Sequence, residues 1–149
     1  MPMAAAPRQR KKERLMKNIL FVADPLDHFK IYKDTTFSMM REAQRRGYRI
    51  AACLPQDIQW KSGGVVTATV QQITLTGDAR DWYRVDISEA KALKDFDAVL
   101  MRKDPPFDAE YIYATHLLEQ AEREGAQVIN KPRALRDHPE KLAIMEFPQ

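Results

Sequence analysis

Residues 18–23 read Asn-Ile-Leu-Phe-Val-Ala and carry the strongest structural signal in the chain. A short, unbroken apolar run of this kind is typical of a strand that is buried on both faces of a parallel sheet. Asp24-Pro25 follows at once and predicts a change from strand to loop. Three more such runs occur along the chain, at 48–54, 97–101 and 127–130. We therefore expect four buried, parallel strands.

Helical patterns separate these strands. Asp34 is a suitable N-cap for a helix that Gly47 closes. Asp108 is a suitable N-cap for a second helix, which Gly125 stops. Alternating strands and helices predict an α/β fold, a three-layer, Rossmann-like parallel sheet with helices on both faces and right-handed crossovers. In such sheets ligands bind at the carboxyl ends of the strands.

Three other segments interrupt or extend this pattern. A turn signal at Gly63-Gly64 predicts an inserted β-hairpin, which we expect to be an appendage to the sheet. Residues 77–85 are expected to form an irregular loop, and 89–93 a short helix. Asp137-x-x-Glu140 has the form of a capping box and predicts a last helix over 141–146.

The composition excludes several classes of protein. The chain has 149 residues, 44% of them hydrophobic and 30% charged, which is typical of one soluble globular domain. Its longest apolar runs have five residues, far fewer than the roughly 20 that a membrane span needs. A single cysteine, Cys53, excludes an internal disulfide and a cysteine zinc cluster. We therefore expect neither a membrane protein nor a disulfide-stapled secreted module.

The basic charge is concentrated in an N-terminal arm, residues 1–16. Residues 8–17 contain six basic residues and one acidic residue, which leaves 18 basic and 20 acidic residues in the rest of the chain. A nucleic-acid-binding domain carries its positive charge on the folded surface, so we expect no nucleic-acid partner. The arm is expected to be disordered, and contact with RNA or an anionic surface is the alternative.

Polar residues at the strand exits offer the best candidates for chemistry. No G-x-G-x-x-G motif follows the first strand, and no G-x-x-x-x-G-K-[ST] loop is present. Arg102-Lys103-Asp104 directly follows the third apolar strand. Arg102 can hold a carboxylate with two parallel hydrogen bonds. The alternatives are a solvated charge cluster and a structural ion pair between Arg102 and either Asp104 or a neighbouring acid.

A second candidate group lies at the N-terminus of the first helix. Lys33, Asp34 and Thr35 stand where free backbone N–H groups and the helix dipole attract anionic groups. The alternative is an ordinary N-cap formed by Asp34. Taken alone, Lys141 reads as an ordinary exposed lysine.

The run Met101-Arg102-Lys103-Asp104-Pro105-Pro106-Phe107-Asp108 resembles the signature of bacterial glutathione synthetases. Other motifs match that family in the same order: Asp24-Pro25, Lys33-Asp34-Thr35-Thr36-Phe37, Glu42-Ala43-Gln44-Arg45-Arg46-Gly47-Tyr48, Glu110-Tyr111-Ile112-Tyr113-Ala114-Thr115, Asn130-Lys131-Pro132, Leu135-Arg136-Asp137 and Glu140-Lys141-Leu142. The resemblance covers about residues 17–149.

The resemblance implies an ATP-dependent carbon–nitrogen ligase of glutathione biosynthesis. In this family, ATP and Mg²⁺ (or Mn²⁺) convert a carboxylate of γ-glutamylcysteine into an acyl phosphate, which the amine of glycine attacks. The fold implied is of the pre-ATP-grasp type, in a cytoplasmic homo-oligomer. Residues 17–137 would form the N-terminal, substrate-side domain, and 138–149 a helix leading into an ATP-grasp region that this chain lacks. The chain alone is therefore expected to be inactive.

The resemblance also assigns roles to individual residues. It implies that Arg102 faces the peptide substrate, with Lys33, Asp34 and Thr35 as further substrate-binding candidates near the same cleft. It implies that Lys141 contacts ATP. Catalytic residues and metal ligands are expected outside this chain. Pro139 departs from the pattern of some relatives, and we expect the last helix to tolerate it. The alternative function is a non-catalytic module that binds an acidic peptide or small molecule.

Overall fold

The computed structural model describes residues 16–147, in which seven strands form one mixed sheet. Almost the whole N-terminal arm, residues 1–15, lies outside the described residues. The strands are β1 (Asn18–Val22), β2 (Arg49–Cys53), β3 (Ile58–Gln59), β4 (Thr67–Leu75), β5 (Tyr83–Ala92), β6 (Ala98–Met101) and β7 (Val128–Ile129). The helices are α1 (Thr35–Arg45), α2 (Ala109–Arg123) and α3 (Pro132–Asp137), with 3-10 turns at Leu26–His28, Pro55–Asp57, Leu93–Asp95 and Ala143–Glu146.

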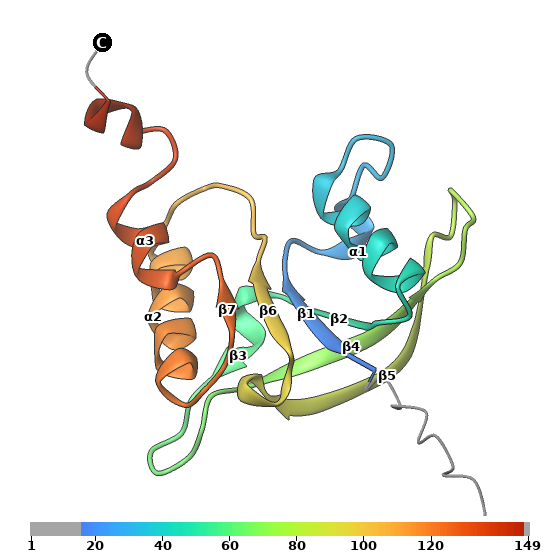
Figure 1. The fold of residues 1–149 in the computed structure, drawn as a ribbon, viewed down its shortest axis with the longest axis horizontal. Helices are drawn as coiled ribbons and strands as arrows, with labels where there is room; N and C mark the ends of the chain where they lie inside the picture. The colour runs from blue at the N-terminus through green and yellow to red at the C-terminus, as the bar shows by residue number, and fades with distance from the viewer. Residues whose placement is uncertain (1–15, 148–149) are drawn as a thin grey trace, which may run out of the picture.

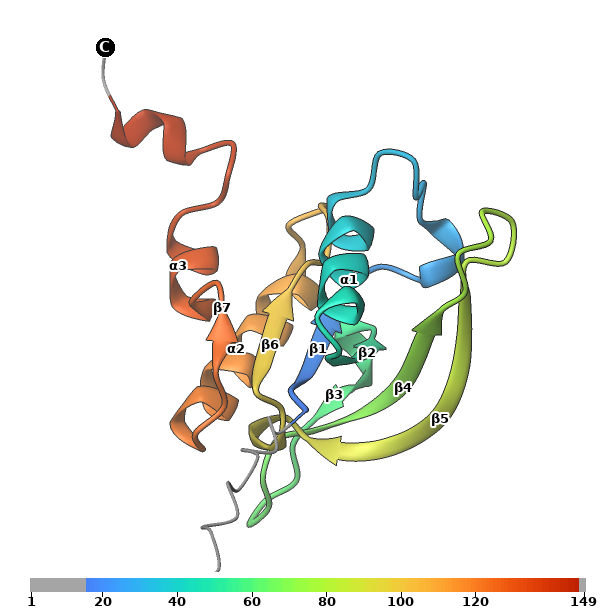
Figure 2. The same cartoon turned by 45° about the vertical axis from the view of Figure 1, so that its right-hand side comes forward.

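The four expected strands lie side by side and run parallel, in the order β2-β1-β6-β7. β4 joins this sheet antiparallel to β2, and β5 pairs with the other edge of β4. β4 and β5 form a long, curved hairpin at one side of the molecule, while β7 lies at the opposite side (Figure 1 and Figure 2). The α/β fold class is therefore confirmed, with a sheet that is mixed because of β3, β4 and β5.

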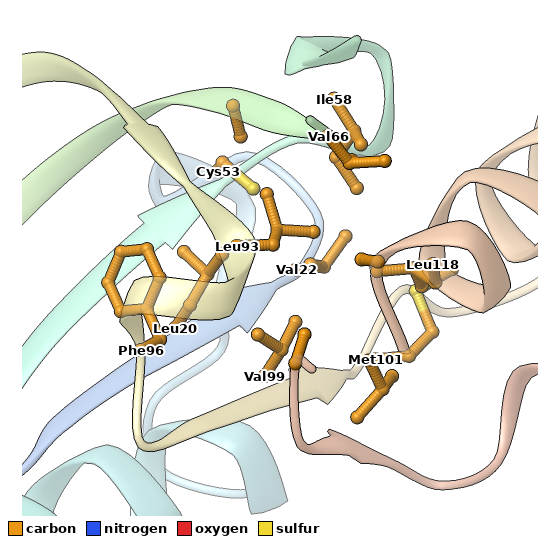
Figure 3. Close-up of a cluster of buried hydrophobic side chains, with 14 of the residues drawn as sticks. Leu20, Val22, Cys53, Ile58, Val66, Leu93, Phe96, Val99, Met101 and Leu118 are labelled. Carbon is orange, nitrogen blue, oxygen red and sulfur yellow. The ribbon is translucent and has the colours of Figure 1, made fainter. Parts of the chain in front are cut away.

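Helices cover both faces of the sheet because the side chains of a strand alternate between its faces. Leu20 and Val22 of β1 pack on the side of α2, in a buried cluster with Leu118 (Figure 3). Phe21 packs on the opposite side, with Met40 of α1. All five side chains are fully shielded from solvent. This alternation gives the three layers that the apolar run at 18–23 predicts.

The caps of the two long helices are confirmed. The carboxylate of Asp34 accepts a hydrogen bond from the backbone N–H of Phe37 at 2.8 Å, which fixes the start of α1. The carboxylate of Asp108 accepts one from Tyr111 N–H at 2.9 Å at the start of α2. No helix between residues 16 and 147 is long and apolar enough to cross a bilayer.

The prediction of an appended hairpin is wrong in its placement. β3 and β4 do pair antiparallel on either side of Gly63, which has a φ of 76°. However, β4 also pairs with β2 through residues 71–73, so it belongs to the main sheet. The helix expected at 89–93 is wrong too, because these residues belong almost entirely to β5, which pairs with β4 along nine positions. Tertiary pairing overrides the helical propensity of this short segment.

The C-terminal prediction also needs correction. After β7, Pro132 occupies the first turn of α3, where its missing N–H costs nothing. Asp137 ends this helix and pairs with Arg133 at 3.2 Å, so the expected capping box does not form. The helix expected over 141–146 is only a 3-10 turn at Ala143–Glu146, which follows a turn that contains Pro139.

Candidate functional site

The carboxyl ends of β1 and β6 place two polar segments next to each other. Val22 and Met101 are paired in the parallel register of these strands. The N–H of Arg102 donates to the carbonyl of Val22 at 2.7 Å, which extends the pairing beyond β6. Asp24 and Arg102 therefore leave the sheet side by side, as the carboxyl-end rule for ligand sites predicts.

A cavity of about 220 Å³ lies at this edge. The segment after β1, the first turn of α1 and the segment after β6 form its walls. The lining residues are Asp24, His28, Phe29, Asp34, Thr36, Arg102 and Asp104. The cavity thus combines one guanidinium with three carboxylates and an imidazole.

Arg102 is half-buried, and α1 orients it. Its Nε donates a hydrogen bond to Oγ1 of Thr36 at 3.2 Å. Thr36 is itself buried, only 6% exposed. Among residues 16–147, Arg102 forms no ion pair and its side chain makes no other hydrogen bond. The terminal N–H groups of the guanidinium therefore have no partner among these residues, and the alternative of a structural ion pair with Asp104 is wrong.

Lys103, rather than Arg102, forms the ion pair in this cluster. Its Nζ lies 2.8 Å from Oδ1 of Asp24, and both side chains are about three-quarters shielded from solvent. The other oxygen of Asp24 accepts a hydrogen bond from the N–H of Asp104 at 2.9 Å. Asp24 thus holds the segment after β6 in place. Its charge is balanced by Lys103, and Arg102 is the cation of the cavity that has no ion-pair partner within residues 16–147.

The structure separates the residues expected at the start of α1. Asp34 lines the cavity, as does Thr36. Lys33 and Thr35 are exposed and do not line it, and Nζ of Lys33 lies 5.8 Å from the ring centroid of Tyr32. The cluster at Lys33-Asp34-Thr35 therefore contributes one of its three side chains to this cavity.

Lys141 lies apart from this cavity. It is exposed, in the turn between α3 and the 3-10 turn at Ala143–Glu146, and it is not a lining residue. The segment after α3 extends away from the sheet (Figure 1). Among the residues that the structure describes, no group of three or more His, Cys, Asp or Glu side chains could hold a metal ion.

Two aromatic residues that sequence reasoning did not select support a wall of the cavity. The ring of Trp82 stacks on Phe29 with 5.5 Å between centroids and an interplanar angle of 19°. The hydroxyl of Tyr83 donates to Asp27 at 2.7 Å. This bond to a carboxylate, with some burial, raises the pKa of Tyr83 to about 12. The start of β5 thus anchors the loop between β1 and α1, more than 50 residues earlier in the chain.

Thr36 and Asp24 were also not among the predicted site residues, although both belong to motifs that carry the family resemblance. Asp24 follows the first apolar strand as Arg102 follows the third, so the carboxyl-end rule could have selected it. Thr36 had no comparable signal, because its bond to Arg102 joins residues 66 positions apart.

Comparison with known proteins identifies the family of this chain. Residues 16–136 match the family described as "Prokaryotic glutathione synthetase, N-terminal domain". The chain is 58% identical over 129 residues to the glutathione synthetase of Ralstonia nicotianae. This aligned region covers 87% of this chain and 40% of that protein. It is 51% identical over 135 residues to the glutathione synthetase of Nitrosomonas europaea, covering 88% and 42% of the two chains. For that of Neisseria meningitidis serogroup B, the identity is 46% over 136 residues, covering 89% and 42%.

The chain spans about two-fifths of the length of these curated relatives. The family match, in contrast, covers most of the chain and includes β1, α1 and the Arg102 segment. The chain therefore belongs to the family of prokaryotic glutathione synthetase N-terminal domains.

Proposed function

We propose that this chain is the substrate-side domain of a glutathione synthetase, an ATP-dependent ligase that joins γ-glutamylcysteine and glycine. The observation that carries the proposal is the half-buried guanidinium of Arg102, oriented by Thr36 and without an ion-pair partner between residues 16 and 147. An arginine in this state binds a carboxylate through two parallel hydrogen bonds. In this proposal Arg102 holds a carboxylate of γ-glutamylcysteine.

The carboxylates of the cavity suit the other end of such a substrate. Asp34 uses Oδ1 to cap α1, and Asp104 is exposed with its carboxylate in no ion pair in the described part of the chain. Together they offer negative charge to an ammonium group at a short distance from Arg102. A γ-glutamyl group carries both an ammonium and a carboxylate on one carbon, so it can satisfy both signs of charge.

The exposed apolar residues after α3 support the proposal that the chain is part of a larger enzyme. Leu142, Ile144, Met145 and Phe147 are each between 58% and 73% exposed within six residues. Contiguous exposed apolar surface of this kind marks interaction sites in soluble proteins. In our proposal, the portion of the enzyme that this chain does not contain covers them and supplies the sites for ATP and Mg²⁺. Lys141 lies in the same segment and would contact ATP.

The proposal includes the remaining expectations of the family, a homo-oligomer in the cytoplasm. ATP would supply the phosphoryl group and Mg²⁺ would balance its charge. In this proposal the metal ligands lie outside this chain, as the family resemblance implies. The residues of this chain bind and orient the substrate: Asp24 and Thr36 fix the Arg102 segment, and Arg102 positions the substrate carboxylate.

The decisive experiment replaces Arg102 with lysine in a full-length glutathione synthetase that contains this chain as its N-terminal domain. Lysine keeps the positive charge but loses the planar fork. We expect kcat/KM for γ-glutamylcysteine to fall by at least about tenfold, roughly 1.4 kcal/mol of transition-state stabilisation. The melting temperature should barely change, because Arg102 makes no ion pair within the described residues. A normal kcat/KM would remove Arg102 from the substrate site.

A further inference from the structure

A second and larger cavity lies outside the proposed substrate site. Its volume is about 420 Å³, against about 220 Å³ for the cavity at Arg102, and the two share no lining residue. It is formed by the loop before α1, the exposed side of α1, the end of β4 and the turn that leads into β5. The lining residues are Ile31, Phe37, Arg41, Gln44, Leu75, Thr76, Gly77, Asp78, Ala79 and Trp82.

The apolar part of this cavity is built from side chains that are already held in place. Trp82 is only 8% exposed and stacks on Phe29. Its ring also meets the ring of Phe37 edge-on, with 5.2 Å between the two centroids. Ile31 and Leu75 also pack against this buried cluster. The cavity therefore offers a preformed apolar surface with an aromatic wall.

Polar contacts fix the outer walls. The side-chain amide of Gln44 bonds both backbone groups of Leu75, accepting from its N–H at 2.7 Å and donating to its carbonyl at 3.1 Å. This clamp ties α1 to the end of β4. In the turn, Thr76 donates to the carbonyl of Asp81 at 2.5 Å, and Thr76 N–H donates to the carbonyl of Trp82 at 3.0 Å. A ligand would enter a cavity whose walls are largely formed in advance, which is the usual condition of a small-molecule site.

Two opposite charges lie at the rim. Arg41 is exposed, and its guanidinium lies 5.8 Å from the ring centroid of Phe37. Asp78 is also exposed, and one of its oxygens accepts the N–H of Arg80 at 2.8 Å. Neither side chain forms an ion pair in the part of the chain that the structure describes. The rim thus offers a cation for an acid group and a carboxylate for an ammonium group.

We infer that this cavity binds a free apolar α-amino acid. Its carboxylate would pair with Arg41, its ammonium with Asp78, and its side chain would lie against Trp82 and Phe37. A purely apolar ligand would leave both charges unused, and a simple anion would meet the repulsion of Asp78. A zwitterion with an apolar side chain satisfies the two charges and the apolar surface together.

The test uses the 149-residue chain with Trp60→Phe, which leaves Trp82 as its single tryptophan. The emission of Trp82 is followed during titration with L-phenylalanine. Three comparison compounds each remove one feature: N-acetyl-L-phenylalanine lacks the ammonium, L-phenylalaninamide lacks the carboxylate, and glycine lacks the apolar side chain. We expect saturable binding of L-phenylalanine and at least tenfold weaker binding of the other three.

Two variants assign the charges. Arg41→Gln should weaken the binding of L-phenylalanine at least fivefold and abolish the preference for L-phenylalanine over its amide. Asp78→Asn should also weaken the binding of L-phenylalanine at least fivefold. It should abolish the preference for L-phenylalanine over its N-acetyl derivative. Arg45→Gln is the matched control, because Arg45 lies on the same helix but pairs with Glu42 and does not line the cavity. Circular dichroism checks that all three variants fold.

Several results would overturn the inference. An unsaturable response to L-phenylalanine would show that the cavity binds no apolar amino acid. Equal affinity for the amide or the N-acetyl compound would mean that the charged rim plays no part. Unchanged affinity in Arg41→Gln and Asp78→Asn would place the binding elsewhere. None of these results bears on Arg102, so this inference and the proposed function can fail separately.

Discussion

Arg102 and Lys103 are adjacent cations at the end of the same strand, yet their surroundings give them different roles. Lys103 is neutralised by Asp24 at 2.8 Å and serves to hold its own backbone segment. Arg102 points to a hydroxyl, that of Thr36, which orients the guanidinium without cancelling its charge. A carboxylate in place of Thr36 would turn Arg102 into a structural ion pair. The identity of one small side chain on α1 thus keeps Arg102 available to a ligand.

Tyr83 is a second residue whose role depends on a single contact, and its replacement gives a prediction. Tyr83→Phe removes the hydrogen bond to Asp27 and leaves the ring in the aromatic cluster. For a bond this exposed, we expect a loss of about 0.5–1 kcal/mol in the free energy of unfolding. In the complete enzyme, KM for γ-glutamylcysteine should rise while kcat changes little, because the loop that loses its anchor includes Phe29 of the cavity wall.

The same variant has a pH signature. Tyr83 has a pKa of about 12 in the folded state against an ordinary value of 10.0, so the folded protein retains a proton that the unfolded chain releases. Its contribution to stability is therefore complete below about pH 10 and is lost as the pH rises towards 12. The stability advantage of wild type over Tyr83→Phe in denaturant unfolding should be largest below about pH 10 and should fall as the pH rises towards 12. A constant difference across this range would contradict the contact.

At the scale of elements, the caps and strand exits were predictable because their signals are local. Asp34, Asp108 and the apolar runs act through neighbours within a few positions, so residue type and spacing are enough. Gly47 and Gly125 were recognisable for the same reason, since φ values of 79° and 106° favour a residue without a Cβ. The rule that ligands meet strand carboxyl ends then selected Arg102 without any knowledge of its partners.

The elements that were missed depend on partners far away in the chain. β5 contains helix-favouring residues, and only its pairing with β4 makes it a strand. The loop between β1 and α1 is anchored by Trp82 and Tyr83 only because the β4–β5 hairpin returns to it. Neither contact leaves a periodic or spacing signal in the sequence. The last predicted helix failed for a local reason: α3 begins at Pro132 and ends at Asp137, so Asp137 does not cap a helix over 141–146.

The two N-cap aspartates allow a prediction that separates helix stability from binding. Asp34 and Asp108 make the same cap bond, at 2.8 Å and 2.9 Å, but only Asp34 lines the substrate cavity. Serine keeps the cap and removes the charge, so both Asp→Ser variants should change the free energy of unfolding by less than about 0.5 kcal/mol. Asp34→Ser should raise KM for γ-glutamylcysteine at least about threefold, roughly 0.6 kcal/mol. Asp108→Ser should leave this KM unchanged. If both variants changed KM equally, Asp34 would have no contact with the substrate.

At the scale of the whole molecule, the two proposed ligand sites lie on either side of one aromatic cluster. Phe29 lines the cavity at Arg102, while Trp82 and Phe37 line the larger cavity. The cluster packs against the face of the sheet that α1 covers. The cavity at Arg102 lies in a chain that spans about two-fifths of the length of its curated relatives, and the proposed function assigns the ATP and metal sites to the remainder. Substrate binding and turnover should therefore be separable in this molecule.

This separation gives the last prediction. The 149-residue chain should bind γ-glutamylcysteine, because the segment after β1, the first turn of α1 and the segment after β6 all belong to it. Titration calorimetry should show one saturable site, weakened at least about tenfold by Arg102→Lys, roughly 1.4 kcal/mol. The same preparation, given ATP, Mg²⁺, γ-glutamylcysteine and glycine, should release ADP no faster than buffer, because in the proposed function the sites for ATP and Mg²⁺ lie in the part of the enzyme that this chain does not contain. ADP release that requires both substrates would show that the chain carries out the reaction unaided, whereas an absence of binding would move the substrate site out of this domain.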